Sequence, residues 1–315
     1  MALTIGVDVG GTKVLGGVVD EGGKVLATTR RATPAEDVAK TLDVIVDVVR
    51  ELTEEHEVTG VGIGAAGWID ASRSTVLFAP NLAWRDEPLR GKVEAALGGL
   101  PVVVENDANV AAWAEFRFGA GEDVDDSMVL FTVGTGIGGG IILGGQLVRG
   151  AHGIAAELGH VQAVPDGQLC GCGRRGCIEQ YASGNALVRF ARTGAKNDPG
   201  DAALLLSLSG GEADAITGPM VTEAAHSGDK VAIDAFHQCG TWLGVSIADM
   251  VQILDPQLIV VGGGVIDAGE LLLGPTMASY NEQIAQRGRL PIADVRPAVL
   301  GNTAGIVGAA DLARR

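Results

Sequence analysis

The chain has 315 residues, which is enough for two domains of roughly 150 residues each. Apolar residues make up 47% of the chain and charged residues 20%, as in an ordinary globular protein. The net charge of −16 argues against nucleic acid or an anionic membrane as the main partner, because both need a basic surface. Glycine alone is unusual, since 48 residues are about twice the normal share.

No apolar stretch reaches the ~20 residues of a membrane span, and no basic and apolar leader precedes Leu3. We therefore expect a soluble, cytoplasmic protein. Three of the four cysteines, Cys170, Cys172 and Cys177, lie close together, which is not the spacing of a disulfide scaffold. The fourth, Cys239, stands in a helical pattern and is expected to be a small buried apolar residue.

The first part of the chain predicts a β-meander followed by a helix. Three apolar runs, Leu3–Val9, Val14–Val19 and Lys24–Thr29, are separated by glycine-rich turns. The sequence Thr33-Pro34-Ala35-Glu36 then predicts a helix start, with threonine as the cap and proline at the first helical position. Apolar residues spaced by four and three positions from Val38 to Leu52 indicate the helix itself.

Further elements follow the same logic. We expect strands at Val61–Gly67 and Val102–Val104, the second ending at Glu105-Asn106-Asp107-Ala108-Asn109. Helices are expected at Ala111–Phe118 and, near the C-terminus, at Thr303–Ala313.

The middle of the chain repeats the plan of its beginning. An apolar strand, Met128–Val133, leads through the turn Gly134-Thr135-Gly136 into a second strand, Gly138–Leu143. A third glycine cluster, Gly262–Gly264, ends the apolar strand Leu258–Val261. These repeated units predict two similar α/β halves that face a cleft.

Glycines beside a hydroxyl residue let backbone N–H groups converge on phosphate oxygens. The turns Gly10–Lys13 and Gly134–Gly136 therefore predict phosphate binding, although such turns also close plain hairpins. Neither a Walker sequence nor a Rossmann fingerprint is present, because the turns lead into strands and not helices. Asp8 is placed to hold a water-coordinated Mg²⁺; the alternative is a carboxylate that caps the turn.

His160, Cys170, Cys172 and Cys177 offer a Cys₃His set, which is typical of a tetrahedral structural zinc site. The alternatives are a disulfide or unpaired thiols. A closed site with four protein ligands cannot activate water, so the zinc would be architectural.

Five motifs carry a resemblance to a known family. In chain order they are Asp8-Val-Gly-Gly-Thr-Lys13, Glu105-Asn-Asp-Ala-Asn109, Gly134-Thr-Gly-Ile-Gly-Gly-Gly140, Glu157-Leu-Gly-His160 and Cys170-Gly-Cys-Gly-Arg-Arg-Gly-Cys177. Together they resemble the ROK family of sugar kinases and repressors, which implies the two-domain actin-like ATPase fold (hexokinase-type, ribonuclease H-like). The stretch Cys177–Gly184 is most similar to the bacterial ATP-dependent glucokinases of that family.

The resemblance implies phosphorylation of glucose at its 6-hydroxyl by ATP, the first step of glycolysis, with Asp107 as the catalytic base. The alternative role for Asp107 is the N-cap of the following helix. The residues implied to bind the sugar are Gly67, Asn81, Asn106, Asp107, Glu157, His160 and Glu179. The residues implied to bind ATP and Mg²⁺ are Asp8, Gly10, Gly11, Thr12, Lys13, Thr135, Gly136, Gly263 and Gly264.

In this reading His160 binds zinc through one ring nitrogen and faces the sugar with the other. Glu157 and Glu179 lie on either side of the zinc loop in sequence, and their alternative role is that of solvated surface charges. By resemblance, residues 1–118 form a small domain that the C-terminal helix at 302–315 joins, and residues 119–301 form a large domain with the zinc loop. A homodimer or homotetramer is also implied.

Three alternatives remain open at this point. A ROK-type sugar-sensing repressor without kinase activity shares the core, but such repressors carry an N-terminal winged helix, whereas here the first strand begins at Leu3. Another hexose, such as N-acetylmannosamine, fructose or allose, is a second alternative. Polyphosphate as the phosphoryl donor is the third; relatives that use it typically lack the cysteine cluster and are more basic, which favours ATP.

Overall fold

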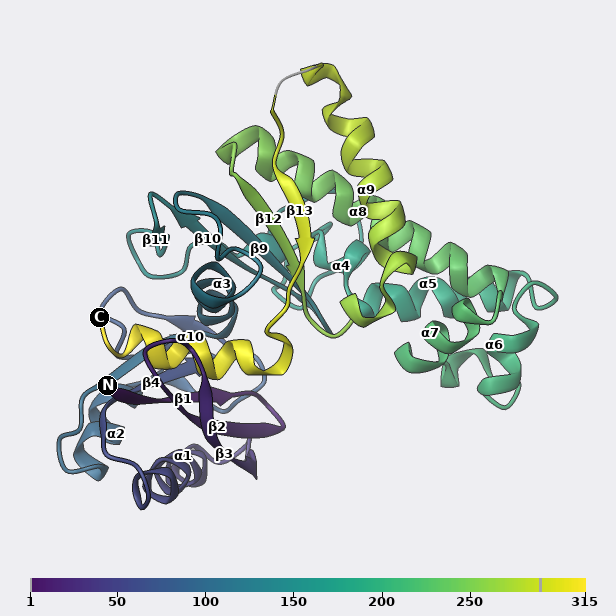
Figure 1. Cartoon of the computed structure of the whole chain (residues 1–315). Coiled ribbons are helices and arrows are strands. Elements are labelled where there is room, and N and C mark those ends of the chain that lie inside the picture. The colour runs from purple at the N-terminus through teal and green to yellow at the C-terminus, as the bar shows by residue number, and fades with distance from the viewer. Residues whose placement is uncertain (1, 289–290) are drawn as a thin grey trace. The chain divides into compact units, whose positions relative to one another are not determined.

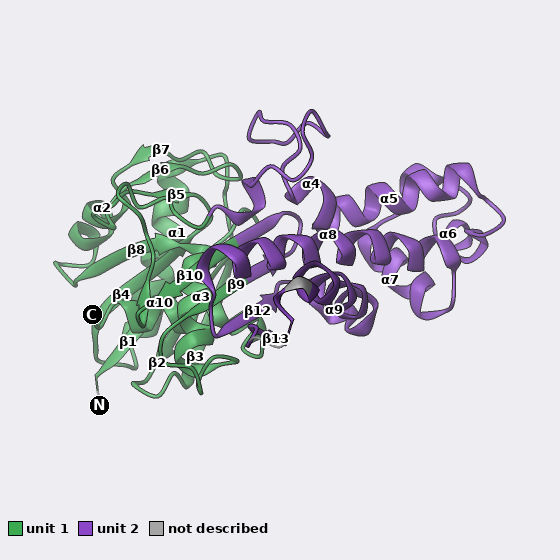
Figure 2. Cartoon of the chain, turned by 90° about the horizontal axis from the view of Figure 1, so that it is seen from above, with its two compact units in different colours: residues 1–130, 139–156, 298–315 green, residues 131–138, 157–297 purple. Residues whose placement is uncertain are grey.

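The computed structural model describes residues 2–288 and 291–315. The chain divides into two compact units, which Figure 2 shows in separate colours. Unit 1 comprises Met1–Leu130, Gly139–Ala156 and Ala298–Arg315, and unit 2 comprises Phe131–Gly138 and Glu157–Pro297. The domain boundaries implied by the resemblance stay a prediction.

Unit 1 contains a five-stranded sheet in the order β3-β2-β1-β4-β8 (Figure 1). Its strands are β1 (Leu3–Val9), β2 (Lys13–Val19), β3 (Val25–Ala32), β4 (Val58–Ala65) and β8 (Val102–Asn106). The first three strands pair antiparallel, which confirms the predicted meander, whereas β1, β4 and β8 run parallel. Fully buried Ile5, Val7 and Ile63 belong to the apolar core around this sheet.

The remaining elements of unit 1 are helices and a small three-stranded sheet. They are α1 (Val38–Thr53), α2 (Leu89–Ala96), α3 (Asp107–Phe118), η5 (Gly301–Thr303), α10 (Ala304–Leu312), β5 (Trp68–Ile69), β6 (Val76–Phe78) and β7 (Arg85–Glu87). Helix α10 confirms the helix predicted near the C-terminus and packs against β1, β4 and α3. Its backbone lies directly on the sheet, because a Cβ at Gly62 would come within 1.8 Å of the Ala309 carbonyl oxygen.

The predicted start of the first helix is wrong. Helix α1 begins at Val38, and its N-cap is Asp37, whose side chain accepts a hydrogen bond from Lys40 N (3.1 Å). Thr33 does not cap it, because the Thr33 hydroxyl donates to the Gly10 carbonyl oxygen instead (2.8 Å). The Thr33–Glu36 segment is thereby held beside the first glycine turn, and the helix starts one turn later.

A second five-stranded sheet has the order β11-β10-β9-β12-β13. Its strands are β9 (Met128–Val133), β10 (Ile137–Leu143), β11 (Gln146–Leu147), β12 (Leu258–Gly262) and β13 (Asp294–Pro297). The antiparallel β10–β11 hairpin corresponds to β2–β3, and the parallel β12–β13 pair corresponds to β4–β8. The matching strand order confirms the internal repeat that the glycine turns predicted.

The helices of unit 2 are α4 (Glu179–Ala182), α5 (Gly184–Asn197), α6 (Ala203–Leu208), α7 (Gly218–His226), α8 (Lys230–Leu254) and α9 (Glu270–Ile284). Single 3₁₀ turns are η1 (Leu158–His160), η2 (Ala213–Ala215), η3 (Ile266–Ala268) and η4 (Ala285–Arg287). Cys239 is buried in α8, as expected. Within the described part of the chain, every helix is too short or too polar to cross a membrane.

Candidate active site and metal centre

The three parallel strands of unit 1 end at one edge of the sheet. Val9 at the end of β1 pairs with Ala65 at the end of β4, and Ala65 pairs in turn with Asn106 at the end of β8. The residues that follow these strands therefore leave the sheet at the same level. In open α/β sheets this carboxyl edge is where ligands bind.

The first glycine turn is closed by its own backbone, since Gly10 N–H donates to the Lys13 carbonyl oxygen (3.0 Å). Asn81 lies against this turn, although it is far away in the sequence. A Cβ at Gly11 would come within 3.0 Å of Asn81 Cβ and 3.1 Å of its carbonyl oxygen. The structure thus brings a predicted sugar ligand next to the predicted phosphate turn.

Asp8 is held between this turn and the beginning of α10. A Cβ at Gly305 would lie only 3.0 Å from Asp8 Cγ, so the helix backbone covers the carboxyl group closely. Burial raises the pKa of Asp8, and the nearby Lys13 ammonium opposes part of that rise. A partly buried carboxylate that is costly to ionise is well suited to a divalent cation, so Asp8 fits the expected Mg²⁺ ligand.

Asn106, and not Asp107, is the N-cap of α3. Its Oδ1 accepts a hydrogen bond from Asn109 N, and its Nδ2 donates to the Gly67 carbonyl oxygen, both at 3.0 Å. Asp107 is the first helical residue, and its Oδ1 accepts from Ala108 N (2.9 Å). The capping role considered for Asp107 is therefore taken by its neighbour, which also joins β8 to the loop at Gly67.

Glu105 and Arg149, two charged residues beside this site, were not among the predicted site residues. Glu105 is only 1% exposed, and its Oε2 lies 3.0 Å from Arg73 Nε and 2.6 Å from Arg149 Nε. Its Oε1 accepts from Asn106 N and from Asn109 Nδ2. A glutamate that ends a run of three valines signals a buried charge, whereas no local pattern marks Arg149 as its partner.

The second glycine turn lies in unit 2. Gly134 N–H donates to the Gly136 carbonyl oxygen (3.0 Å), so this turn too is closed by its own backbone, with a hydrogen bond that spans one residue fewer than in the first turn. Gly263, with a positive φ of 88°, packs against the end of β9, where a Cβ would lie 2.5 Å from the Val133 carbonyl oxygen. The second and third glycine clusters are thereby brought together, with Gly264 facing open space.

Glu179 connects this turn to the cysteine cluster. Its Oε2 accepts a hydrogen bond from Ile137 N (3.1 Å), and a Cβ at Gly136 would come within 2.3 Å of the same oxygen. Its Oε1 lies 3.6 Å from Cys170 Sγ. Glu179 is thus not a freely solvated surface charge, which was the alternative considered for it.

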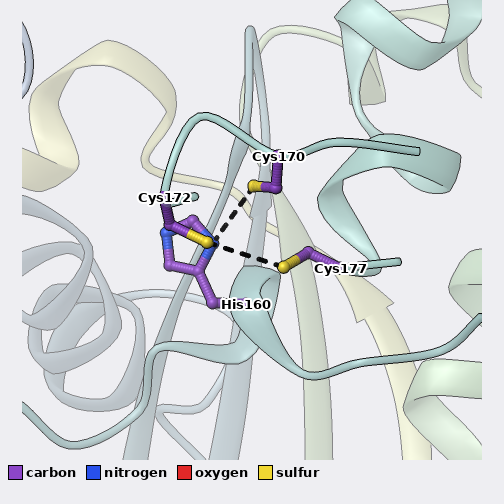
Figure 3. A group of neighbouring side chains, drawn as sticks. All are labelled: His160, Cys170, Cys172 and Cys177. Atoms are coloured by element: carbon purple, nitrogen blue, oxygen red, sulfur yellow. Dashed lines mark hydrogen bonds between the residues drawn. The ribbon is translucent and has the colours of Figure 1, made fainter. Parts of the chain in front are cut away.

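The cysteine cluster is assembled from a loop and the turn η1 (Figure 3). The ligand atoms of His160, Cys170, Cys172 and Cys177 all lie within 4.8 Å of one another. Cys172 Sγ and Cys177 Sγ are 3.7 Å apart, and His160 Nδ1 lies 3.7 Å from Cys170 Sγ. His160 Nε2 points the other way and lies 3.9 Å from Glu157 Oε2.

These distances fit a zinc ion. Zinc–sulfur bonds of about 2.3 Å in a tetrahedron separate two sulfurs by roughly 3.8 Å, and a sulfur and a nitrogen by roughly 3.5 Å. Burial, and after it the neighbouring thiols of Cys170 and Cys172, raise the pKa of Cys177 to about 12. The pKa of Cys170 is also raised, mainly by burial, so a metal ion bound here would stabilise the thiolates of Cys170 and Cys177, which the protein alone disfavours.

The predicted site residues therefore form two groups, one in each unit. Unit 1 holds Asp8, Gly10, Gly11, Thr12, Lys13, Gly67, Asn81, Asn106 and Asp107. Unit 2 holds Thr135, Gly136, Glu157, His160, Cys170, Cys172, Cys177, Glu179, Gly263 and Gly264.

The sequence and the structure of this chain are similar to those of known sugar kinases. The chain is 51% identical to the glucokinase of Streptomyces coelicolor over 314 residues, covering 100% of this chain and 98% of that protein. It is also 53% identical to a ROK family glucokinase from Streptomyces griseus, solved in complex with glucose and AMPPNP, with a TM-score of 0.89 and 99% of both chains covered. The ROK hexokinase of Thermus thermophilus is 32% identical, with a TM-score of 0.84 and coverage of 99% and 98%.

These likenesses confirm the α/β fold class of the actin-like sugar kinases that the motifs implied. The ROK family itself matches over residues 4–315, nearly the whole sequence. The chain therefore belongs to the ROK family.

Proposed function

We propose that the protein is a glucokinase that transfers the γ-phosphoryl group of ATP to the 6-hydroxyl of glucose. Two Streptomyces glucokinases share more than half of their residues with it over essentially the whole length. The observation that carries the proposal is the sheet edge of unit 1. There a carboxylate, two amides and a glycine turn follow strands whose ends lie in register.

In the proposed reaction Asp107 accepts the proton of the 6-hydroxyl as its oxygen attacks the γ-phosphorus. The new oxygen–phosphorus bond forms while the bond to the β,γ-bridging oxygen breaks, and ADP leaves with that oxygen. A carboxylate is a weak base toward a sugar hydroxyl, so Asp107 mainly orients the nucleophile and accepts the proton late. Asp107 lies in the first turn of α3, where Ala108 N donates a hydrogen bond to its Oδ1 and helps to hold the carboxylate in place.

The residues that we propose for sugar binding are Gly67, Asn81, Asn106, Asp107, Glu157, His160 and Glu179. Carboxylate and amide oxygens suit sugar hydroxyls, which need several directional partners at once. The Asn106–Gly67 hydrogen bond would fix two of these groups relative to each other. His160 would present Nε2 while Nδ1 faces the cysteine cluster.

The nucleotide would be bound by the two glycine turns, through Gly10 to Lys13, Thr135, Gly136, Gly263 and Gly264. Asp8 would hold Mg²⁺ through water, and the ion supplies neutralisation of the phosphate charge when it is bound. A zinc ion in the Cys₃His cluster would serve to fix His160 and the loop around it. The cytoplasmic location and the homodimer or homotetramer expected from the sequence stay predictions.

The proposal is tested by ADP release from Mg²⁺-ATP across a panel of hexoses, with polyphosphate as an alternative donor. We expect the highest kcat/KM with glucose and ATP, and little turnover with N-acetylmannosamine or allose. Turnover with polyphosphate alone would contradict the choice of donor. A folded protein that binds glucose without phosphorylating any hexose would contradict the enzyme and favour a sugar-sensing protein.

A further inference from the structure

We propose that Arg149 is a positioning residue that holds the sugar-binding segments of unit 1 in place. It makes no contact with the reacting groups itself. It ties the strand that leads into Asn106 and Asp107 to the loop that follows β5, and to the segment that leads into Glu157. The inference rests on the proposed function, because that function assigns these segments to the sugar.

The Arg149 guanidinium makes three contacts in three directions. Its Nε lies 2.6 Å from Glu105 Oε2, while Nη1 donates to the Ala71 carbonyl oxygen and Nη2 to the Asp70 carbonyl oxygen, both at 2.8 Å. The side chain is only 13% exposed. Because a guanidinium is planar and its Nη donors are fixed, it sets the positions of the two loop carbonyl oxygens, while its Nε, which forms no hydrogen bond, meets Glu105 Oε2 as an ion pair.

The contact between Arg149 and Glu105 acts indirectly on Asp107, the proposed catalytic base. Glu105 Oε1 accepts hydrogen bonds from Asn106 N (3.0 Å) and Asn109 Nδ2 (3.1 Å), on either side of Asp107. With an exposed fraction of 1%, Glu105 has no water to replace a lost partner. A shift of Glu105 would therefore move the first turn of α3, and Asp107 with it.

The second and third contacts act on a rigid loop. The Asp70 carboxylate accepts hydrogen bonds from Ser74 N (2.8 Å) and Thr75 N (2.9 Å), and a third from the Ser72 hydroxyl. Burial would raise the pKa of Asp70, but these hydrogen bonds outweigh it and lower the pKa to about 2. The loop is thus fixed internally, and β5 joins it to Gly67, whose carbonyl oxygen accepts a hydrogen bond from Asn106 Nδ2.

Arg149 also begins the segment that reaches Glu157. Ala155 N–H donates to the Arg149 carbonyl oxygen (3.1 Å), which closes a turn just before that glutamate. Inside the turn Gly153 packs on the same loop, where a Cβ would come within 2.4 Å of the Ile69 carbonyl oxygen. Arg149 therefore lies where β8, the loop that follows β5 and the segment 149–155 meet, and each of these is close in sequence to a proposed sugar ligand.

Arg73 offers a matched comparison within the same cluster. Its Nε lies 3.0 Å from the same Glu105 oxygen, but its side chain is 27% exposed. Arg73 itself lies in the loop that follows β5, and its Nε donates a hydrogen bond to Glu105 Oε2; among the described residues, its guanidinium reaches no loop carbonyl. If Glu105 only needed a neutralising charge, Arg73 and Arg149 would be equivalent. A positioning role for Arg149 requires that the loss of its side chain impair activity more than the loss of the Arg73 side chain.

The test compares the unmodified chain with Arg149→Met, Arg149→Lys and Arg73→Met. Steady-state assays give kcat and the KM of glucose and ATP, calorimetry gives glucose binding, and thermal melting reports the fold. For Arg149→Met we expect glucose KM to rise and kcat to fall, each by about 10-fold or more, with ATP KM within about 2-fold. Arg149→Lys should stay impaired by roughly 5-fold, because one ammonium cannot span the three oxygens. Arg73→Met should change each value by less than about 3-fold.

Several results would overturn the assignment. Kinetics of Arg149→Met close to those of the unmodified chain, equal effects of Arg73→Met and Arg149→Met, or an equal rise in both KM values would each do so. If Arg149→Met does not fold, an unimpaired Arg149→Lys overturns it. An unmodified chain that neither binds nor phosphorylates glucose overturns the proposed function, and this role falls with it. Normal turnover by the unmodified chain and by all three variants overturns the role of Arg149 and leaves the proposed function standing.

Discussion

At the scale of single residues, Asp8 shows how a functional group can reduce stability. Its carboxylate lies against the backbone at Gly305, and burial raises its pKa in the folded chain. The unfolded chain ionises this group more readily, so at neutral pH the charged Asp8 lowers the free energy of unfolding. That penalty disappears as the pH falls through the raised pKa. A bound cation would offset it at neutral pH.

We therefore expect Asp8→Asn to raise the melting temperature of the ligand-free protein at neutral pH and to lower kcat by roughly 100-fold. The gain in stability should shrink at acidic pH, where Asp8 in the unmodified chain is already protonated. Thermal melts at two pH values and steady-state assays measure both effects. Asp43→Asn, on the exposed face of α1, is the control and should change neither. A less stable Asp8→Asn protein at neutral pH would contradict this account.

The raised pKa of Asp8 also predicts the acid limb of activity. Asp8 must be ionised to hold a cation, so kcat/KM for Mg²⁺-ATP should fall with decreasing pH at a higher pH than an ordinary aspartate would produce. A pH profile at saturating glucose measures this limb. More Mg²⁺ should move the limb to lower pH, because the cation competes with the proton. A limb that does not respond to Mg²⁺ would argue against Asp8 as the group responsible.

At the scale of elements, glycines allow α10 to lie on the first sheet. A Cβ at Gly62 in β4 would approach the Ala309 carbonyl oxygen to 1.8 Å, and one at Gly6 in β1 would approach the Ile306 carbonyl oxygen to the same distance. We expect Gly62→Ala to lower the free energy of unfolding by about 3 kcal/mol or more, because the helix must move off the sheet. Gly91→Ala on α2 is the control; with open space around it, it should gain about 0.5–1 kcal/mol. Chemical denaturation distinguishes the two, and equal effects would contradict the packing argument.

At the scale of elements we also expect the loop that carries the Cys₃His cluster to depend on a bound metal ion for its order. Within the described residues its backbone pairs in two isolated bridges, Gln162 with Cys177 and Leu169 with Arg175, and the Cys₃His cluster adds a further connection through side chains. We expect about one zinc ion per chain by elemental analysis. Cys172→Ser should lose the zinc, lower the melting temperature and raise glucose KM more than ATP KM. Cys239, which is buried in α8 and lies outside the cluster, is the control, and Cys239→Ser should leave the zinc content unchanged. Full zinc in Cys172→Ser would contradict the ligand set.

At the scale of the whole molecule, the internal repeat of the two sheets could be predicted because it follows from local sequence patterns. Each half opens with an apolar strand, a glycine turn and a second strand, and the two sheets have the same strand order. The start of α1 could not be predicted from Thr33, because its hydroxyl is taken by Gly10 in a distant turn. Arg149 could not be predicted either, since its contacts with Glu105 and Asp70 exist only once three separate segments have folded.

If Asp107 serves phosphoryl transfer from ATP to glucose, Asp107→Asn should remove most of the transfer rate without removing glucose binding. Single-turnover formation of glucose 6-phosphate is measured beside calorimetric glucose binding for the variant and the unmodified chain. The account predicts that the variant folds and binds glucose, while the rate falls by about 10²–10⁴-fold. A variant that binds glucose and phosphorylates it at nearly the unmodified rate would contradict the account.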